Sequence, residues 1–146
     1  SRWITHPQFV EGDGQFENDV AVITFVDPLP SPAMPILGSQ PSVKGQAMFI
    51  AGWGAPDYQL SVGSARIDQV TDDFIRITYD GELSNACPGD SGGPAYRPFV
   101  GRQAAVGLVS SGTGECAPGG RTFFTNLYTP KILDFIRTHT PGLEVL

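Results

Sequence analysis

The sequence predicts an all-β protein that ends in one helix. Glycine and proline are frequent, with 18 and 13 copies among 146 residues, and charged residues make up only 16% of the chain. The apolar runs are short and rich in β-branched and aromatic residues, which is typical of strands separated by tight turns. The stretch after Thr129 differs, because its apolar residues follow the spacing of a helix.

The length fits one domain or a large part of a bigger one. Apolar residues make up 40% of the chain, which is enough for a buried core. The net charge of −6 argues against a nucleic-acid partner and against an anionic membrane surface. No apolar run approaches the length of a membrane span, so no membrane partner is expected either.

The first part of the chain is expected to consist of strands, turns and a connector. Residues 12–14 form a loop tip, and the apolar run at 20–25 predicts a strand. Residues 28–35 contain four prolines. Together with residues 38–45 they predict an extended connector, because proline removes a backbone donor and disfavours a helix.

The second part of the chain is expected to contain several strands and the helix. Residues 65–70, 74–79 and 103–109 predict strands, with a turn at Asp72 and Asp73. The helix begins after Thr129 as N-cap, with Pro130 at its first position. Its apolar face holds Ile132, Leu133, Phe135 and Ile136, and it ends before residues 141–142, which are Pro-Gly.

The most specific stretch is residues 85–94, Asn-Ala-Cys-Pro-Gly-Asp-Ser-Gly-Gly-Pro. It resembles the active-serine segment of the trypsin/chymotrypsin-like serine endopeptidases. A serine hydroxyl attacks poorly unless a base lies beside it and backbone donors face the developing oxyanion. The resemblance implies that Ser91 is the nucleophile and that the N–H groups of Gly89 and Ser91 form the oxyanion hole.

Other segments resemble the same family in the same order. Residues 18–25 resemble its Asn-Asp-Ile-Ala-Leu strand, which implies that Asp19 orients the catalytic histidine. Taken alone, Asn-Asp before a strand is ordinary turn chemistry. Residues 46–54 resemble the strand and Gly-Trp-Gly turn that open the second barrel, where Trp53 is expected to pack structurally. Residues 121–128 resemble the last strand.

The resemblance implies a trypsin-like double β-barrel. Residues 1–40 would form the C-terminal part of the first barrel and the connector, and residues 41–146 the second barrel with its C-terminal helix. Cys87 and Cys116 would form a disulfide, which implies an oxidising compartment and a secreted protein. Met48 and Arg97 stand where many relatives have another disulfide.

The resemblance also assigns the substrate pocket. Asn85 would lie at its floor, Thr122 at its wall, and Ser110, Ser111 and Gly112 would pair with the substrate backbone. Ser110 would also hydrogen-bond Asp19. Because Asn85 is neutral, we expect an apolar or uncharged substrate side chain and no strong preference for basic ones.

Asp90 precedes the serine in the family motif. In the family this aspartate pairs with the ammonium group that is made when a zymogen is cut. The resemblance therefore implies an activation ion pair at Asp90. The ammonium would come from another chain, because Ser1 is not suited to that role.

The general base is the missing part of this interpretation. The chain has two histidines, His6 and His139, and neither lies in the family's catalytic-histidine motif. His6 belongs to a His-Pro turn, and His139 lies at the end of the helix, where a cation is favoured by the helix dipole. Both are therefore interpreted as structural.

We therefore expect a serine endopeptidase that acts on proteins or peptides. This chain would be the larger one of a two-chain molecule, and a separate N-terminal chain would carry the histidine. No cofactor or metal is expected. The alternative is a non-catalytic homologue that serves as a binding or regulatory module. A lipase or esterase is disfavoured, because those enzymes place the serine in a Gly-x-Ser-x-Gly elbow.

Overall fold

The computed structural model describes residues 1–114 and 116–146, and it is built mostly from strands. The strands are β1 (Arg2–Thr5), β2 (Val10–Glu11), β3 (Phe16–Glu17), β4 (Ala21–Thr24), β5 (Ala47–Gly52), β6 (Ser61–Val70), β7 (Phe74–Thr78), β8 (Pro94–Phe99), β9 (Arg102–Thr113) and β10 (Arg121–Asn126). The helix α1 (Pro130–His139) follows the last strand. The all-β prediction with one terminal helix is confirmed.

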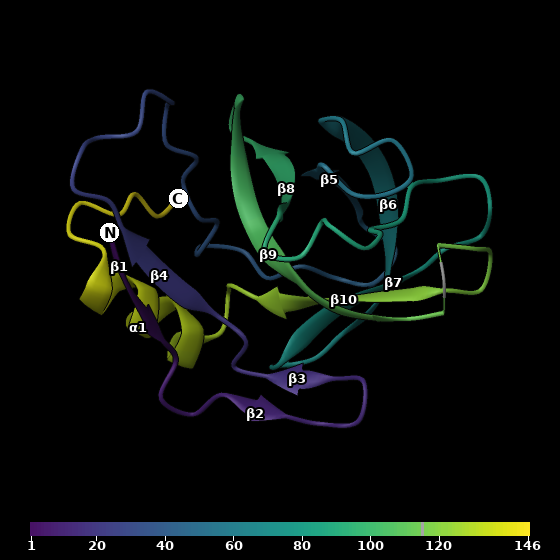
Figure 1. The fold of residues 1–146 in the computed structure, drawn as a ribbon, viewed down its shortest axis with the longest axis horizontal. Coiled ribbons are helices and arrows are strands. Elements are labelled where there is room, and N and C mark those ends of the chain that lie inside the picture. The colour runs from purple at the N-terminus through teal and green to yellow at the C-terminus, as the bar shows by residue number, and fades with distance from the viewer. Residues whose placement is uncertain (115) are drawn as a thin grey trace.

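The second part of the chain forms a closed barrel. Its strands run in the order β10-β7-β6-β5-β8-β9, and every neighbouring pair is antiparallel (Figure 1). The turn predicted between β6 and β7 is present, where the Thr71 hydroxyl accepts hydrogen bonds from the N–H groups of Asp73 and Phe74. Closure leaves no unpaired sheet edge within this barrel.

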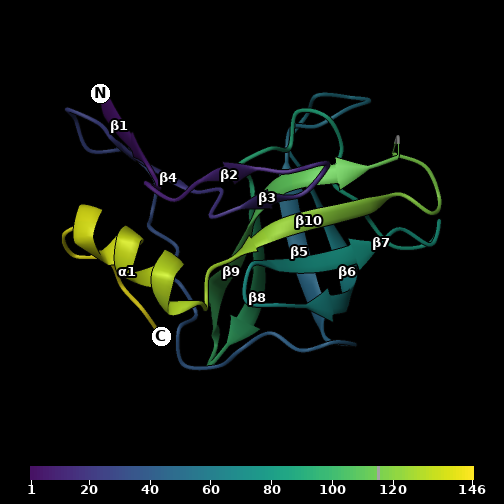
Figure 2. The ribbon, with the colours of Figure 1, turned by 90° about the horizontal axis from the view of Figure 1, so that it is seen from below.

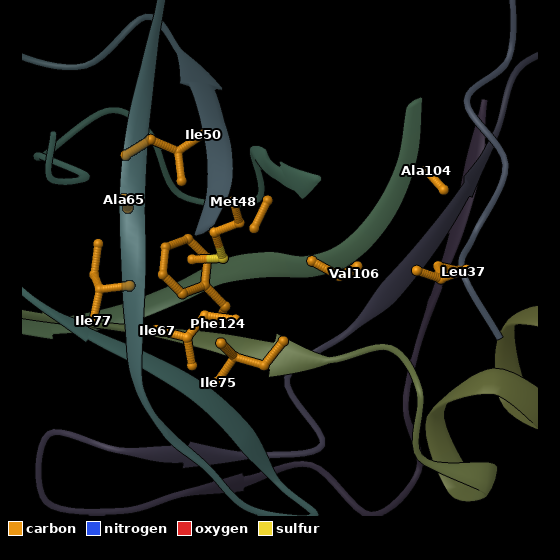
Figure 3. Close-up of a cluster of buried hydrophobic side chains, with 11 residues drawn as sticks. Leu37, Met48, Ile50, Ala65, Ile67, Ile75, Ile77, Ala104, Val106 and Phe124 are labelled. Atoms are coloured by element: carbon orange, nitrogen blue, oxygen red, sulfur yellow. The ribbon is translucent and has the colours of Figure 1, made fainter. Parts of the chain in front are cut away.

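The barrel is filled by a cluster of buried apolar side chains that alternate along the strands (Figure 3). Phe124 of β10 is fully buried among them. The cluster consists of Leu37, Met48, Ile50, Ala65, Ile67, Ile75, Ile77, Ala95, Ala104, Val106 and Phe124. Because successive side chains of a strand face opposite ways, β7 buries Ile75 and Ile77 but not the residue between them.

A second cluster joins α1 to the barrel and to the N-terminal segment. The helix buries the four apolar residues that were predicted to form its face. They pack with Val20, Ile36, Ala105 and Leu127. The predicted N-cap position is correct, but Thr129 makes no side-chain cap bond, because its hydroxyl donates to the carbonyl oxygen of Asn126 at 2.9 Å.

The N-terminal segment forms two small sheets outside the barrel. β1 pairs with β4, and β2 pairs with β3 as a hairpin whose tip lies at the predicted loop. Figure 2 shows the hairpin crossing in front of β9 and β10, while β1 and β4 lie on the side of α1. The proline-rich connector is extended as predicted, with Ile36 bridging Ala105 and Val145.

The structure corrects three details of the sequence-based interpretation. β6 begins at Ser61 instead of residue 65, and β9 continues through Thr113 instead of ending at 109. Trp53 is 60% exposed, so its predicted packing role is wrong.

Among the described residues, no helix is long and apolar enough to cross a bilayer.

The β8–β9 turn places a β-branched residue in an unfavourable backbone conformation. Only Val100 and Gly101 separate the two strands, and their φ angles are +46° and +74°. Positive φ at both positions is the signature of a type I′ turn, which favours Asn-Gly. Val100 is 83% exposed, so its side chain gains little packing in return.

We predict that Val100→Asn raises the free energy of unfolding by about 1 kcal/mol, because asparagine tolerates positive φ better than a β-branched residue. Urea unfolding of the full-length protein measures the change. Val43→Asn is the matched control at an exposed site without positive φ, and it should change stability by less than about 0.5 kcal/mol. Equal effects at the two sites would contradict the prediction.

Candidate active site

Ser91 lies in the loop that leads into β8, and its side chain is exposed. The loop is held from both sides. The Asp90 N–H donates to the carbonyl oxygen of Cys87 at 3.0 Å, and the Gly93 N–H donates to that of Asp90 at 2.9 Å. The Gly92 N–H donates to the carbonyl oxygen of Val109, and the Val109 N–H donates to that of Gly93. The nucleophile candidate is therefore fastened to β9.

Two N–H groups of this loop remain without an internal acceptor. Among the described residues, the amides of Gly89 and Ser91 donate no hydrogen bond, whereas those of Asp90, Gly92 and Gly93 do. Gly89 has φ +103°, and a Cβ there would come within 3.2 Å of the Cα of Gly54. Glycine is needed at position 89 for both reasons.

The Asp90 carboxylate connects the serine loop to the turn after β5. Its Oδ1 accepts a hydrogen bond from the Gly54 N–H at 2.7 Å, and its Oδ2 accepts one from the Cys87 N–H at 2.8 Å. A Cβ at Gly52 would lie 1.9 Å from Oδ1, and one at Gly54 would lie 2.3 Å from Oδ2. The two glycines around Trp53 therefore make room for this carboxylate.

Asp19 follows a residue with an unusual backbone. Asn18 is buried and has φ +53°, a conformation that asparagine tolerates well. The backbone of Asp19 is fixed to β10, where the Thr125 hydroxyl donates to its carbonyl oxygen at 2.6 Å. Turn chemistry and family resemblance were alternative interpretations of this Asn-Asp pair, and the unusual φ of Asn18 is compatible with both.

Ser110 connects Asp19 to the barrel. Its hydroxyl donates to Oδ2 of Asp19 at 2.6 Å, as predicted. Ser110 is also the extra residue of a β-bulge, because Phe123 pairs with Ser111 while Phe124 pairs with Val109. Bulges redirect side chains near functional sites. The sequence contains no signal for this bulge, so reasoning from residues alone could not have found it.

A pocket lies between the serine loop, β9 and β10. It brings together all five residues that were assigned to the substrate pocket, along with Ser91; these are Asn85, Ser110, Ser111, Gly112 and Thr122. The predicted disulfide between Cys87 and Cys116 is present and borders the pocket. The Thr122 hydroxyl donates to Oδ1 of Asn85 at 2.6 Å, a contact that the sequence did not indicate.

The β2–β3 hairpin reaches the same strand. The Ser111 hydroxyl donates to the carbonyl oxygen of Gly14 at 3.1 Å, which ties the hairpin tip to β9. The hairpin is further braced by an edge-on contact between Phe9 and Phe16, whose ring centroids lie 6.0 Å apart. The sequence predicted the loop tip but not its position beside the pocket.

Both histidines are engaged at α1, as expected for structural residues. His6 is buried, its Nδ1 accepts the Gln8 N–H at 3.2 Å, and its Nε2 lies 3.4 Å from the carbonyl oxygen of Lys131. The rings of His6 and His139 pack on Phe135 at centroid distances of 4.8 and 4.9 Å. The Asp19 carboxylate receives its described hydrogen bond from Ser110, and from neither histidine.

Met48 and Arg97 occupy the barrel interior. Met48 is fully buried and Arg97 is 8% exposed. The Nε of Arg97 has no hydrogen-bond partner among the described residues, and burial lowers the pKa of its guanidinium. Across residues 1–114 and 116–146, no cluster of histidine, cysteine or acidic side chains could hold a metal ion.

The comparison with protein families decides the family. The trypsin family model matches residues 1–136. The chain belongs to the trypsin family. A match over nearly the whole chain agrees with the closed six-stranded barrel and C-terminal helix seen here.

Of three curated relatives of this trypsin-family chain, two are proteases by name. The chain is 28% identical to CLIP domain-containing serine protease B4 of Anopheles gambiae, which aligns with 92% of it, and 26% identical to a venom protease of Bombus pensylvanicus, also over 92%. It is 28% identical to vitamin K-dependent protein C of Rattus norvegicus over 76% of the chain. The chain spans 44%, 65% and 30% of the lengths of these relatives.

We predict that Gly54→Ala lowers the free energy of unfolding by about 1–3 kcal/mol, because the new methyl group must displace the Asp90 carboxylate. Urea unfolding of the full-length protein measures the change. Trp53→Ala in the same turn removes a largely exposed side chain, so it should cost less than about 0.5 kcal/mol. The account of this turn is wrong if the two variants are equally stable.

Proposed function

We propose that this chain supplies the nucleophile and the acid of a serine endopeptidase. The observation that carries the proposal is the hydrogen bond from Ser110 to Asp19, because Ser110 lines the same pocket as Ser91. Asp19 and Ser91, which are 72 positions apart in the sequence, are thereby brought to one site. The exposed hydroxyl of Ser91 and the unpaired amides of Gly89 and Ser91 support the same assignment.

The proposed reaction is acyl transfer. The Oγ of Ser91 attacks the carbonyl carbon of the scissile peptide bond while its proton passes to a histidine base. The amides of Gly89 and Ser91 stabilise the oxyanion. The C–N bond then breaks, the base returns the proton to the leaving amine, and water hydrolyses the ester on Ser91.

The acid is arranged to orient such a base. Ser110 occupies Oδ2 of Asp19, and no described residue donates a hydrogen bond to Oδ1. That oxygen is available for the N–H of an imidazole. Since both histidines of this chain are engaged at α1, we propose that the base comes from an N-terminal segment outside these 146 residues, held as a separate chain in a two-chain molecule.

The β1–β4 sheet supports a partner segment of this kind. Trp3 and Ile23 are directly opposite each other in its register and are 73% and 58% exposed. A two-stranded sheet is marginal by itself, and a large exposed apolar patch marks an interaction surface. We propose that residues 1–40 complete a first barrel with the partner segment, and that residues 41–146 form the second barrel with its helix.

Asp90 offers a means of activation. Its carboxylate is held by the backbone N–H groups of Gly54 and Cys87, next to the loop that carries Ser91. We propose that the protein is a zymogen until cleavage creates an ammonium group that pairs with Asp90. The disulfide supports a secreted protein, and the two relatives that are proteases by name support protein or peptide substrates.

We predict that a fluorophosphonate adds once to the 15.6 kDa chain of the matured full-length protein, at Ser91. Only a serine activated by a base reacts readily with such a reagent. Denaturing intact-mass spectrometry gives the mass of the adduct and reveals a smaller chain. Ser91→Ala should abolish the adduct, and Ser39→Ala, at an exposed site outside the pocket, should leave it unchanged.

The same spectrum contains the results that would contradict the proposal. An unmodified chain beside an intact smaller chain would favour a binding or regulatory homologue without catalysis. An adduct that persists in Ser91→Ala would assign the nucleophile to another residue.

We predict that Ser110→Ala lowers kcat/KM about 10- to 100-fold, because a hydrogen bond to a charged group contributes roughly 1.5–3 kcal/mol. Steady-state hydrolysis of one peptide by the full-length protein measures the loss. Ser110→Thr keeps the hydroxyl and should recover most of the rate. Thr113→Ala, near the exposed end of the same strand, is the control and should have little effect. Equal rates for the Ser110 variants would show that this hydroxyl does not support Asp19.

A further inference from the structure

The floor of the pocket contains a hydrogen bond that fixes the orientation of an amide. The hydroxyl of Thr122, which is 2% exposed, donates to Oδ1 of Asn85 at 2.6 Å. Asn85 comes from the serine loop and Thr122 comes from β10, so the contact exists only in the folded chain. The carbonyl end of the Asn85 amide is thereby committed to Thr122.

The other end of the amide is a donor without an acceptor. Among the described residues, none accepts a hydrogen bond from Nδ2 of Asn85. A carboxamide amino group carries two N–H bonds and cannot accept. Asn85 lines the pocket together with Ser91, and it also lines a neighbouring pocket beside β5 and β6. An Nδ2 group directed into the pocket with Ser91 would offer a bound substrate side chain a hydrogen-bond donor.

The two serine hydroxyls of the pocket add no donor beside Asn85, because their protons are already bound. The hydroxyl protons of Ser110 and Ser111 are directed to Asp19 and to the carbonyl oxygen of Gly14. Among the pocket-lining residues that the structure describes, Arg121 carries the only charge, and it is positive. A cationic substrate side chain would therefore face the like charge of Arg121 and could not accept a hydrogen bond from Asn85.

We propose that this pocket selects a substrate residue whose side chain ends in an oxygen acceptor, with glutamate first and glutamine second. The inference rests on the proposed function and replaces the expectation of an apolar or uncharged side chain with that of an oxygen acceptor. An oxygen acceptor pairs with Nδ2 of Asn85, whereas an apolar side chain would desolvate that group without a partner. The positive charge of Arg121 favours the carboxylate of a glutamate side chain over the carboxamide of a glutamine side chain. Thr122 acts through Asn85 and is a positioning residue.

The first experiment compares four peptides that differ only in the residue before the scissile bond, glutamate, glutamine, leucine or lysine. The matured full-length protein should cleave the glutamyl peptide with a kcat/KM about tenfold or more above that of the leucyl peptide. Glutamine should fall between them and lysine should be poorest. Preference for leucine or lysine would overturn the inference.

A binding measurement keeps this inference separate from the proposed function. The full-length Ser91→Ala protein cannot form the acyl-enzyme, and it retains Asn85, Thr122 and Arg121 in the pocket. Product peptides that end in glutamate should bind it about tenfold more tightly than those that end in leucine, as measured by calorimetry. If the protein with Ser91 is labelled by the fluorophosphonate but Ser91→Ala binds both peptides equally, the proposed pocket selectivity is refuted and the assignment of Ser91 as nucleophile stands. The selective binding without labelling would support the pocket and refute catalysis.

Variants test the roles of the individual groups. Thr122→Val removes the hydroxyl at similar volume, so the glutamyl-to-leucyl ratio should fall several-fold, and Thr122→Ser should restore it. Thr138→Val on α1 is the control and should leave the ratio unchanged. Arg121→Met should bring the glutamyl-to-glutaminyl ratio close to one. An unchanged glutamyl-to-leucyl ratio in Thr122→Val would show that the hydroxyl does not orient the Asn85 amide.

Discussion

The arrangement of the site depends on one half-buried carboxylate. Asp90 is adjacent to Ser91 in the chain, and its two oxygens accept hydrogen bonds from backbone N–H groups on different segments. A carboxylate taken partly out of water needs such donors to offset its lost hydration. Those bonds fix the serine loop to the turn after β5, and the turn in turn needs Gly52 and Gly54 so that the carboxylate fits. The Gly-Trp-Gly turn therefore needs its two glycines because the Asp90 carboxylate of the serine motif binds there.

Strand β9 extends that arrangement to the rest of the site. Consecutive residues make different connections, because Val109 binds the serine loop, Ser110 binds Asp19 and Ser111 binds the β2–β3 hairpin. Such a sequence of contacts requires the bulge at Ser110, since strict alternation would send neighbouring side chains to opposite faces. A register change of one residue would disconnect the acid from the pocket.

The sequence was informative where local chemistry decides the structure. Proline, glycine and β-branched residues located the connector, the turns and most strands, and the Ser91 and Asp19 motifs placed residues that the fold brings to one region. Prediction from the sequence failed where contacts between distant segments decide the structure. Neither the exposure of Trp53 nor the bond from Thr122 to Asn85 has a local signal, since each depends on which strands become neighbours. The Thr129 hydroxyl likewise binds Asn126, which a helix-capping rule does not foresee.

The exposed apolar side chains of β1 and β4 and the Oδ1 side of the Asp19 carboxylate have one physical explanation. β4 begins two residues after Asp19, and its Ile23 is exposed opposite Trp3. Exposed apolar surface favours a covering segment, and the Oδ1 of Asp19, to which no residue in the described part of the chain donates, favours a donor. Because Asp19 is fixed to β10 and Ser110, a segment that packs on β4 enters at a set position relative to the pocket. Hydrophobic burial on β4 would then supply the binding free energy, and the Asp19 carboxylate would supply the orientation that a histidine base needs.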